Sequence, residues 1–159
     1  DYDGPVYLRF GRPSVPNFTE KDGKFEIGKA LHLVEGSDVT ILATGHLVWH
    51  ALEAAEQLEE KGISAEVINI HTIKPLDEEA ILNSVKKTRC VVTCEEHNYL
   101  GGLGESVSGV LAKNDPVYQE FVATNDTFGE SGTPAELMEK YGLDTKSIVE
   151  AVNKVLAKK

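Results

Sequence analysis

The sequence predicts an α/β fold, a three-layer α/β/α arrangement in which helices cover a mostly parallel sheet of about five strands. Apolar runs suited to buried strands alternate with segments of helical periodicity, at the spacing typical of strand–helix–strand units. Glycines or helix-capping residues stand at the junctions between these segments. A polar, proline-containing stretch, SVPNFTEKDGK, separates this regular region from a short strand-like segment near the start.

The regular pattern opens with a strand, a helix and a second strand. Residues 39–44 form a nearly continuous apolar run, as expected for a strand that is buried on both faces. Gly45 turns the chain into a helix whose apolar positions keep helical spacing, and Gly62 ends that helix. The next strand is expected over residues 65–70.

The middle of the chain repeats this alternation. Asp77, at the end of the KPLD tetrapeptide, is the expected N-cap of a second helix. A third strand is expected over residues 89–93, followed by the loop EEHNYLGGLG and a helix over residues 105–112. A fourth strand is expected over residues 116–122.

Two helices are expected at the end of the chain. Thr133-Pro134-Ala135-Glu136 has the spacing of a capping box with proline at the first helical position. Gly142 is expected to stop that helix, and Asp144 to cap the last one. The apolar stripe of the last helix predicts that it packs on the core.

The beginning of the chain predicts a domain boundary. Pro5 to Phe10 is rich in strand formers and is followed by Gly11 and Pro13. We expect residues 1–15 to hold the last strand and the end of a preceding domain, 16–36 to be a linker, and 37–159 to be the second domain. The first residue is Asp, so a piece of a longer polypeptide is expected.

Composition limits the classes of function. Hydrophobic residues make up 41% and charged residues 26%, which is typical of a soluble globular domain. A formal charge of −10 argues against nucleic acid or anionic lipid as a partner. Cys90 and Cys94 point to the same face of one strand, too far apart along it to bridge each other. Free thiols favour a cytoplasmic location.

Arg9 and Arg12 are the most informative charged residues. The stretch from Arg9 to Lys29 holds five basic and three acidic residues, so it is locally positive in a negative chain. An arginine just beyond the carboxyl end of a parallel strand lies where such sheets bind ligands, and its planar group suits a phosphate. The alternative is a surface arginine paired with a neighbouring carboxylate.

Three histidines raise the question of a metal site. His46 and His50 are one helical turn apart, and His71 ends the next strand. No further ligand at matching depth is evident, so we expect no metal site. The alternative is that His46 caps its helix and that His50 is exposed or in the core.

Glu95, Glu96 and His97 follow the third strand and precede Gly101-Gly102-Leu103-Gly104. A carboxylate and an imidazole at a strand end could perform acid–base chemistry, and glycines before a helix could hold a phosphate. The spacing is not that of a dinucleotide-binding motif, and tight turns need glycine in any case. A structural role is favoured, and the roles of these residues stay open.

The sequence contains no nucleophile elbow, no thiol with a partnered histidine, and no Gly-Asp-Gly for a metal–diphosphate site. We therefore expect no catalytic, cofactor-binding or metal-binding residue in this chain.

Four stretches together resemble the C-terminal part of transketolase: VYLRFGRP, DVTILATGHLVWHALEAAEQLEEKGISAEVINIHTIKPLD, VVTCEEHNYLGGLGESV and FGESGTPAELMEKYGLD. Deoxyxylulose-phosphate synthase and the β subunit of 2-oxo acid dehydrogenases share the strand–helix–strand and KPLD portions. The SGTPAELMEKYGL ending is more similar to transketolase. A stand-alone interaction or regulatory module that has lost the chemistry is a further alternative.

The resemblance implies a three-domain transferase of the pentose phosphate pathway, moving a two-carbon ketol unit between sugar phosphates. Thiamine diphosphate and Mg²⁺ would lie between the first two domains of opposite subunits in a homodimer. The partner of this chain would be the N-terminal and middle domains, on the same polypeptide or on a separate subunit. The matched motif Gly11-Arg12-Pro13 implies that Arg12 contacts the substrate phosphate, and that the isolated chain is inactive.

Overall fold

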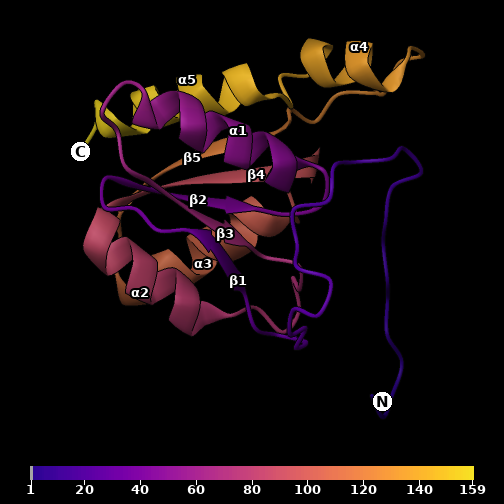
Figure 1. Ribbon diagram of the computed structural model, residues 1–159, viewed down its shortest axis with the longest axis horizontal. Coiled ribbons are helices and arrows are strands. Elements are labelled where there is room, and N and C mark those ends of the chain that lie inside the picture. Colours follow the sequence, from indigo (N-terminus) through magenta and orange to yellow (C-terminus); the bar gives the residue numbers. More distant parts are fainter. Residues whose placement is uncertain (1) are drawn as a thin grey trace.

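The computed structural model describes residues 2–159 and confirms the α/β fold (Figure 1). Five strands form one sheet in the order β1-β3-β2-β4-β5. The strands are β1 (Leu31–Val34), β2 (Val39–Ala43), β3 (Ala65–Asn69), β4 (Cys90–Asn98) and β5 (Tyr118–Thr124). The helices are α1 (Leu47–Glu59), α2 (Glu78–Thr88), α3 (Leu103–Asn114), α4 (Pro134–Lys140) and α5 (Thr145–Leu156).

Helices cover both faces of the sheet. Helices α1 and α5 pack together on one face, and α2 and α3 lie on the other (Figure 1). Each face of the sheet carries its own hydrophobic core, and alternating side chains of β2 belong to one core or the other. Ile41 packs with α1 and α5, whereas Leu42 packs with α2 and α3. No helix within residues 2–159 is long and apolar enough to cross a membrane.

Strands β2, β3, β4 and β5 are parallel, and β1 is the exception. It pairs with β3 in the antiparallel sense, so the sheet is mixed. This strand lies inside residues 16–36, for which we predicted only a linker. A run of four residues is too short to predict a strand within a polar stretch. The strand with which it pairs, β3, lies more than thirty residues further along the chain.

Three predicted helix caps are confirmed. The Asp77 carboxylate accepts a hydrogen bond from the Ala80 amide at 3.1 Å, and its second oxygen accepts one from Ala30 at 2.9 Å. Thr133 forms the full capping box of α4 with Glu136. Asp144 caps α5 through the Ser147 amide at 2.8 Å. Because Ala30 directly precedes β1, its hydrogen bond to Asp77 also ties the start of β1 to the start of α2.

Several boundaries differ from those predicted. Strand β4 continues through the polar residues to Asn98, five residues beyond the expected end, because it pairs with β5 as far as Asn98 and Thr124. Strand β5 begins at Tyr118, two residues later than expected, and α3 begins at Leu103, two residues earlier. Helix α3 begins early because the buried carboxylate of Glu95 accepts hydrogen bonds from the amides of its first residues, Leu103 and Gly104.

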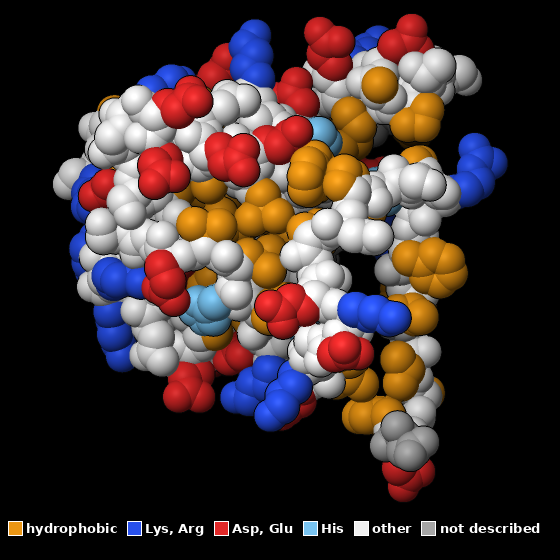
Figure 2. Space-filling view, in the orientation of Figure 1, with side chains coloured by type: hydrophobic (Ala, Val, Ile, Leu, Met, Phe, Trp, Pro, Cys, Tyr) orange, Lys and Arg blue, Asp and Glu red, His pale blue; other side chains and the backbone are white. Residues whose placement is uncertain are grey.

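The segment before β1 extends along the outside of the body (Figure 1). Residues 5–10 form no strand pairing within residues 2–159, and Val6, Tyr7, Leu8 and Phe10 are exposed. Figure 2 shows hydrophobic side chains along this segment. Such a segment fits a strand that would pair elsewhere, so the predicted division at residues 15 and 36 stays a prediction. Asp1 lies outside the described residues.

The two cysteines behave as predicted. Cys90 and Cys94 are both free and both contribute to the core beneath α1 and α5, so they share one face of β4. Burial raises the pKa of the Cys94 thiol well above its usual range. Neither thiol is therefore activated for chemistry.

Glu120 on β5 attaches helix α5 to the sheet edge. Its carboxylate is nearly buried and accepts hydrogen bonds from Lys154, at 2.6 Å, and from Lys158. Burial alone would raise the pKa of Glu120, but the two lysine hydrogen bonds outweigh it and hold that pKa below its ordinary value of 4.5.

We predict that Glu120→Gln lowers the free energy of unfolding by about 1–2 kcal/mol at neutral pH. Because the folded-state pKa is depressed, this contribution is present above pH 4.5 and is lost as the pH falls through the folded-state value. Chemical denaturation of both proteins between pH 3 and pH 8 measures the difference. A difference that stays constant across this range would contradict the assignment.

Candidate functional site

The carboxyl ends of the parallel strands gather several polar residues. Strands β2, β3 and β4 run in the same direction, so the residues that follow Ala43, Asn69 and Cys94 lie at the same edge of the sheet. Ligands of open α/β sheets bind at this edge. A ligand of this domain would therefore be expected at this edge.

The N-terminal segment crosses this edge. Arg9 donates a hydrogen bond from Nη2 to the main-chain oxygen of Glu96 at 3.2 Å. Gly11 lies against the ring of His46, because a Cβ added at Gly11 would be 2.2 Å from His46 Cε1. The next residue, Arg12, is exposed. Residues far apart in the sequence are thus neighbours here.

Arg12 makes no ion pair with a carboxylate within residues 2–159, where every ion pair uses another cation. The surface-pair alternative considered from the sequence is thus not found in the described part of the chain. A guanidinium with all its donors open can form a two-point contact with a phosphate or sulfonate.

Glu96 and His46 form an ion pair beneath the crossing segment, with 3.1 Å between Glu96 Oε2 and His46 Nδ1. His46 occupies the N-cap position of α1, but its side chain makes no capping hydrogen bond. Its imidazole is instead directed at Glu96. Sequence reasoning missed this pair because fifty positions separate the two residues and no local pattern joins them.

Glu95 and the glycine-rich turn have a structural role. The Glu95 side chain is buried and accepts hydrogen bonds from the first amides of α3, Leu103 at 2.7 Å and Gly104 at 2.8 Å. A Cβ at Gly102 would lie 2.1 Å from Glu95 Oε2, so only glycine lets the carboxylate approach. The chain's own carboxylate thus occupies the helix end that could otherwise have held a phosphate.

The other candidate side chains are dispersed. His97 donates from Nδ1 to the Asn98 carbonyl at 2.7 Å and is half-exposed. His50 bonds to Thr145 between α1 and α5, at 3.0 Å. His71 stacks on Phe25 with 4.6 Å between ring centroids. The three histidines considered as metal ligands, His46, His50 and His71, thus each contact a different neighbour.

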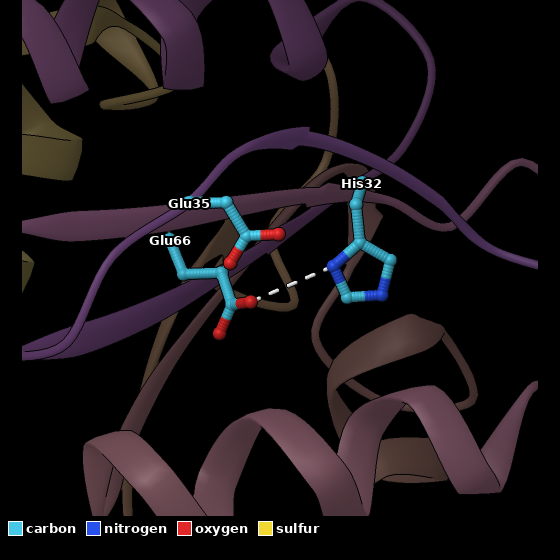
Figure 3. A group of neighbouring side chains, drawn as sticks. All are labelled: His32, Glu35 and Glu66. Carbon is cyan, nitrogen blue, oxygen red and sulfur yellow. Dashed lines mark ion pairs between the residues drawn. The ribbon is translucent and has the colours of Figure 1, made fainter.

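One group of metal-type ligands is present among residues 2–159, at the other end of β3 (Figure 3). His32, Glu35 and Glu66 offer atoms that lie within 4.8 Å of one another. Lys87 already occupies this group, with its Nζ 3.1 Å from Glu66 and 3.3 Å from Glu35. The hydrogen bond to Glu66 raises the pKa of Lys87, so the ammonium supplies the charge that the buried carboxylate needs.

This group therefore serves to hold the sheet edge. Glu66 also accepts a hydrogen bond from Ser84, whose hydroxyl contacts Thr40, and these polar groups join α2 to β2 and β3. A cation would have to displace Lys87 to bind. The donor groups of this chain do not fit a metal-bound diphosphate here or at the α3 end occupied by Glu95.

Comparison with known proteins places the chain in a family. The family model described as "Transketolase, C-terminal domain" matches residues 28–148. This chain belongs to the transketolase C-terminal domain family. The match begins before β1, so the missed edge strand is part of the family's domain.

Similar curated proteins are also transketolase subunits or sections. This transketolase C-terminal domain is 48% identical over 158 residues to a 6-deoxy-6-sulfo-D-fructose transketolase subunit of Clostridium sp. (strain MSTE9), covering 99% of this chain and 49% of that protein. It is 44% identical to a putative transketolase C-terminal section of Methanocaldococcus jannaschii, covering 99% of this chain and 50% of that protein. The chain thus spans about half the length of these curated relatives.

Solved structures share the fold. A chain described as "Split gene transketolase, inactive beta4 tetramer" matches with a TM-score of 0.89 and 46% identity, over 92% of this chain and 48% of that one. A Pichia stipitis transketolase complex with sedoheptulose 7-phosphate matches with a TM-score of 0.61 and 20% identity, over 82% of this chain and 18% of that one. The fold of the transketolase C-terminal domain is therefore conserved at low sequence identity.

Proposed function

We propose that this chain is the C-terminal portion of a transketolase that transfers a two-carbon ketol unit between sugars carrying a phosphate or sulfonate. The open guanidinium of Arg12 beside the carboxyl edge of the sheet carries the proposal, as the group that binds the substrate anion. Two relatives, each of which this chain matches over about half of its length, support the proposal. The Clostridium relative is named for 6-deoxy-6-sulfo-D-fructose. A second relative, from Phocaeicola vulgatus and 42% identical, is named for apulose-4-phosphate. Both of those sugars bear a strongly acidic group.

The domain division forms part of the proposal. Residues 1–15 would end the preceding domain, 16–36 would link the two domains and supply the edge strand β1, and 37–159 would form the rest of the C-terminal domain. The exposed apolar side chains of residues 6–10 support a strand that pairs within the preceding domain. The partner would be the N-terminal transketolase portion, on the same polypeptide or on a separate subunit, in a homodimer of the complete enzyme.

Thiamine diphosphate and Mg²⁺ would be bound by that partner portion. The donor groups of this chain are engaged by Lys87 and by the α3 amides, which supports a cofactor site elsewhere. This chain would contribute assembly and substrate binding, and by itself it would be inactive. A cytoplasmic location and a place in pentose phosphate metabolism stay predictions.

Activity assays of the complete enzyme test the proposal. We expect ketol transfer from xylulose 5-phosphate to an aldose phosphate, and none from a 2-oxo acid.

The second candidate is a 1-deoxy-D-xylulose-5-phosphate synthase. One such enzyme, from Geobacter sulfurreducens, is 39% identical to this chain, which covers 25% of that protein. Turnover of a 2-oxo acid without ketol transfer would favour that candidate or a 2-oxo acid dehydrogenase β subunit. No turnover at all would favour a non-enzymatic module.

A further inference from the structure

The segment that carries Arg12 is held against the rest of the chain by few contacts. Within residues 2–17, the bond from Arg9 to the Glu96 carbonyl, at 3.2 Å, is the single hydrogen bond to residues 18–159. No described residue before Leu31 belongs to a helix or strand. The position of Arg12 therefore depends on a small number of anchoring groups.

The second anchor is the packing of Gly11 on His46. An added Cβ at Gly11 would lie 2.2 Å from Cε1 and 2.3 Å from Nε2 of the imidazole, which is far inside van der Waals contact. The backbone of Gly11 is not in the left-handed region. An alanine here would have to displace the imidazole, so the close approach of the ring favours glycine at the position directly before Arg12.

Glu96 joins the two anchors. Its carboxylate holds the His46 ring at 3.1 Å, while its own carbonyl oxygen accepts the bond from Arg9. Glu96 belongs to the end of β4, two residues beyond the last pair with β2 and between the β5-paired residues Cys94 and Asn98. The strand on either side of Glu96 is thus tied to β5, and the same residue supplies both contacts to the N-terminal segment.

We infer that His46 and Glu96 are positioning residues, which seat the Arg9–Arg12 segment so that Arg12 meets the anionic group of the substrate. This inference rests on the proposed role of Arg12 and adds the residues that would set its location. A partly exposed ion pair contributes little to global stability. A binding group displaced by about 1 Å, however, can lower the rate by ~100-fold.

Steady-state kinetics of the complete enzyme provide the test, using a phosphorylated ketose donor and a neutral ketose donor without phosphate. We expect His46→Ala and Glu96→Ala to raise KM for the phosphorylated donor by roughly 5- to 30-fold, with kcat changed by less than ~3-fold. KM for the neutral donor should stay unchanged. Glu96→Gln should behave almost like the unaltered enzyme, because its amide oxygen still accepts a hydrogen bond from the imidazole.

A matched control lies one turn along the same helix. His50 bonds to Thr145 at 3.0 Å, and it lies on the side of α1 that meets α5. His50→Ala should therefore leave KM for both donors unchanged. Thermal unfolding of each variant separates a positioning effect from a loss of folded protein.

A double-mutant cycle tests the contact between Gly11 and His46 directly. Gly11→Ala should raise KM for the phosphorylated donor, because the new methyl group pushes the ring away from Glu96. In the His46→Ala background the same change should add less than about twofold, because the obstructing ring is gone. Equal effects of Gly11→Ala in both backgrounds would overturn the inference.

The results also separate this inference from the proposed function. If Arg12→Ala raises KM while His46→Ala and Glu96→Ala do not, the positioning role is wrong and the role of Arg12 stands. If Arg12→Ala itself leaves KM unchanged, the role of Arg12 falls, and the positioning role falls with it. Equal KM values for Glu96→Ala and Glu96→Gln would also contradict the positioning role.

Discussion

Arg12→Ala in the complete enzyme is expected to lower kcat/KM for a phosphorylated or sulfonated ketose by roughly 10- to 100-fold. The reason is the loss of a charge-assisted contact, which contributes about 1.5–3 kcal/mol at a partly desolvated site. Most of the change should appear in KM, because the anion lies away from the carbon–carbon bond that reacts. Steady-state kinetics with paired anionic and neutral donors measure it.

Two further variants sharpen this expectation. Arg12→Lys keeps the charge but loses the planar two-point geometry, so it should recover only part of the lost kcat/KM. Lys24→Ala removes an exposed cation from the same N-terminal segment and should have little effect. Equal losses for Lys24→Ala and Arg12→Ala would show a general effect of charge and would contradict a specific contact.

Gly102→Ala should be among the most destabilising single changes in this domain. Its new methyl group would fall 2.1 Å from the Glu95 oxygen that binds the Leu103 amide. Either the carboxylate moves and leaves buried amides without a partner, or the turn shifts and disturbs α3. We expect a loss of about 2–4 kcal/mol in the free energy of unfolding.

The control for this prediction lies in the same helix. Gly109 has no atom within 4 Å of an added Cβ, so Gly109→Ala meets open space. It should stabilise α3 by about 0.5–1 kcal/mol, because alanine is the better helix former. Chemical denaturation of both variants measures the contrast. If Gly102→Ala were as well tolerated as Gly109→Ala, the capping role of Glu95 would be wrong.

The elements that could be predicted from the sequence are those with strong local signals. The nearly continuous apolar run over residues 39–44 predicted a strand buried on both faces, and its residues Val39–Ala43 form the central strand β2. Asp77, Thr133 and Asp144 each cap a helix as expected, because a cap needs only the few residues around it. Local chemistry decides these features, so a single sequence suffices to find them.

Features that depend on distant contacts were missed. Strand β1 forms because β3 offers it a free edge, and nothing within LHLV alone requires it. The polar end of β4 stays extended because β5 pairs with it. Both misses follow from the same cause, since a strand is stabilised by its neighbours more than by its own residues.

The candidate site shows the same division. The position of Arg12 after a strand-like segment made it a candidate, and its assignment as the phosphate ligand came from the resemblance to transketolase. The family match confirms the protein class, and the role of Arg12 stays a prediction. The support of the N-terminal segment by His46 and Glu96 could not be predicted, because it joins three stretches that are distant in the chain. The glycines of the turn were expected to be structural, but their carboxylate partner was found only in the folded chain.

Calorimetric titration of Mg²⁺–thiamine diphosphate into the purified chain tests the central claim most directly. The claim is that this portion contributes an anion-binding arginine while the cofactor site lies in the partner portion. We predict no binding to the chain alone and saturable binding to the complete enzyme under the same conditions. Stoichiometric binding by the chain alone would contradict the account.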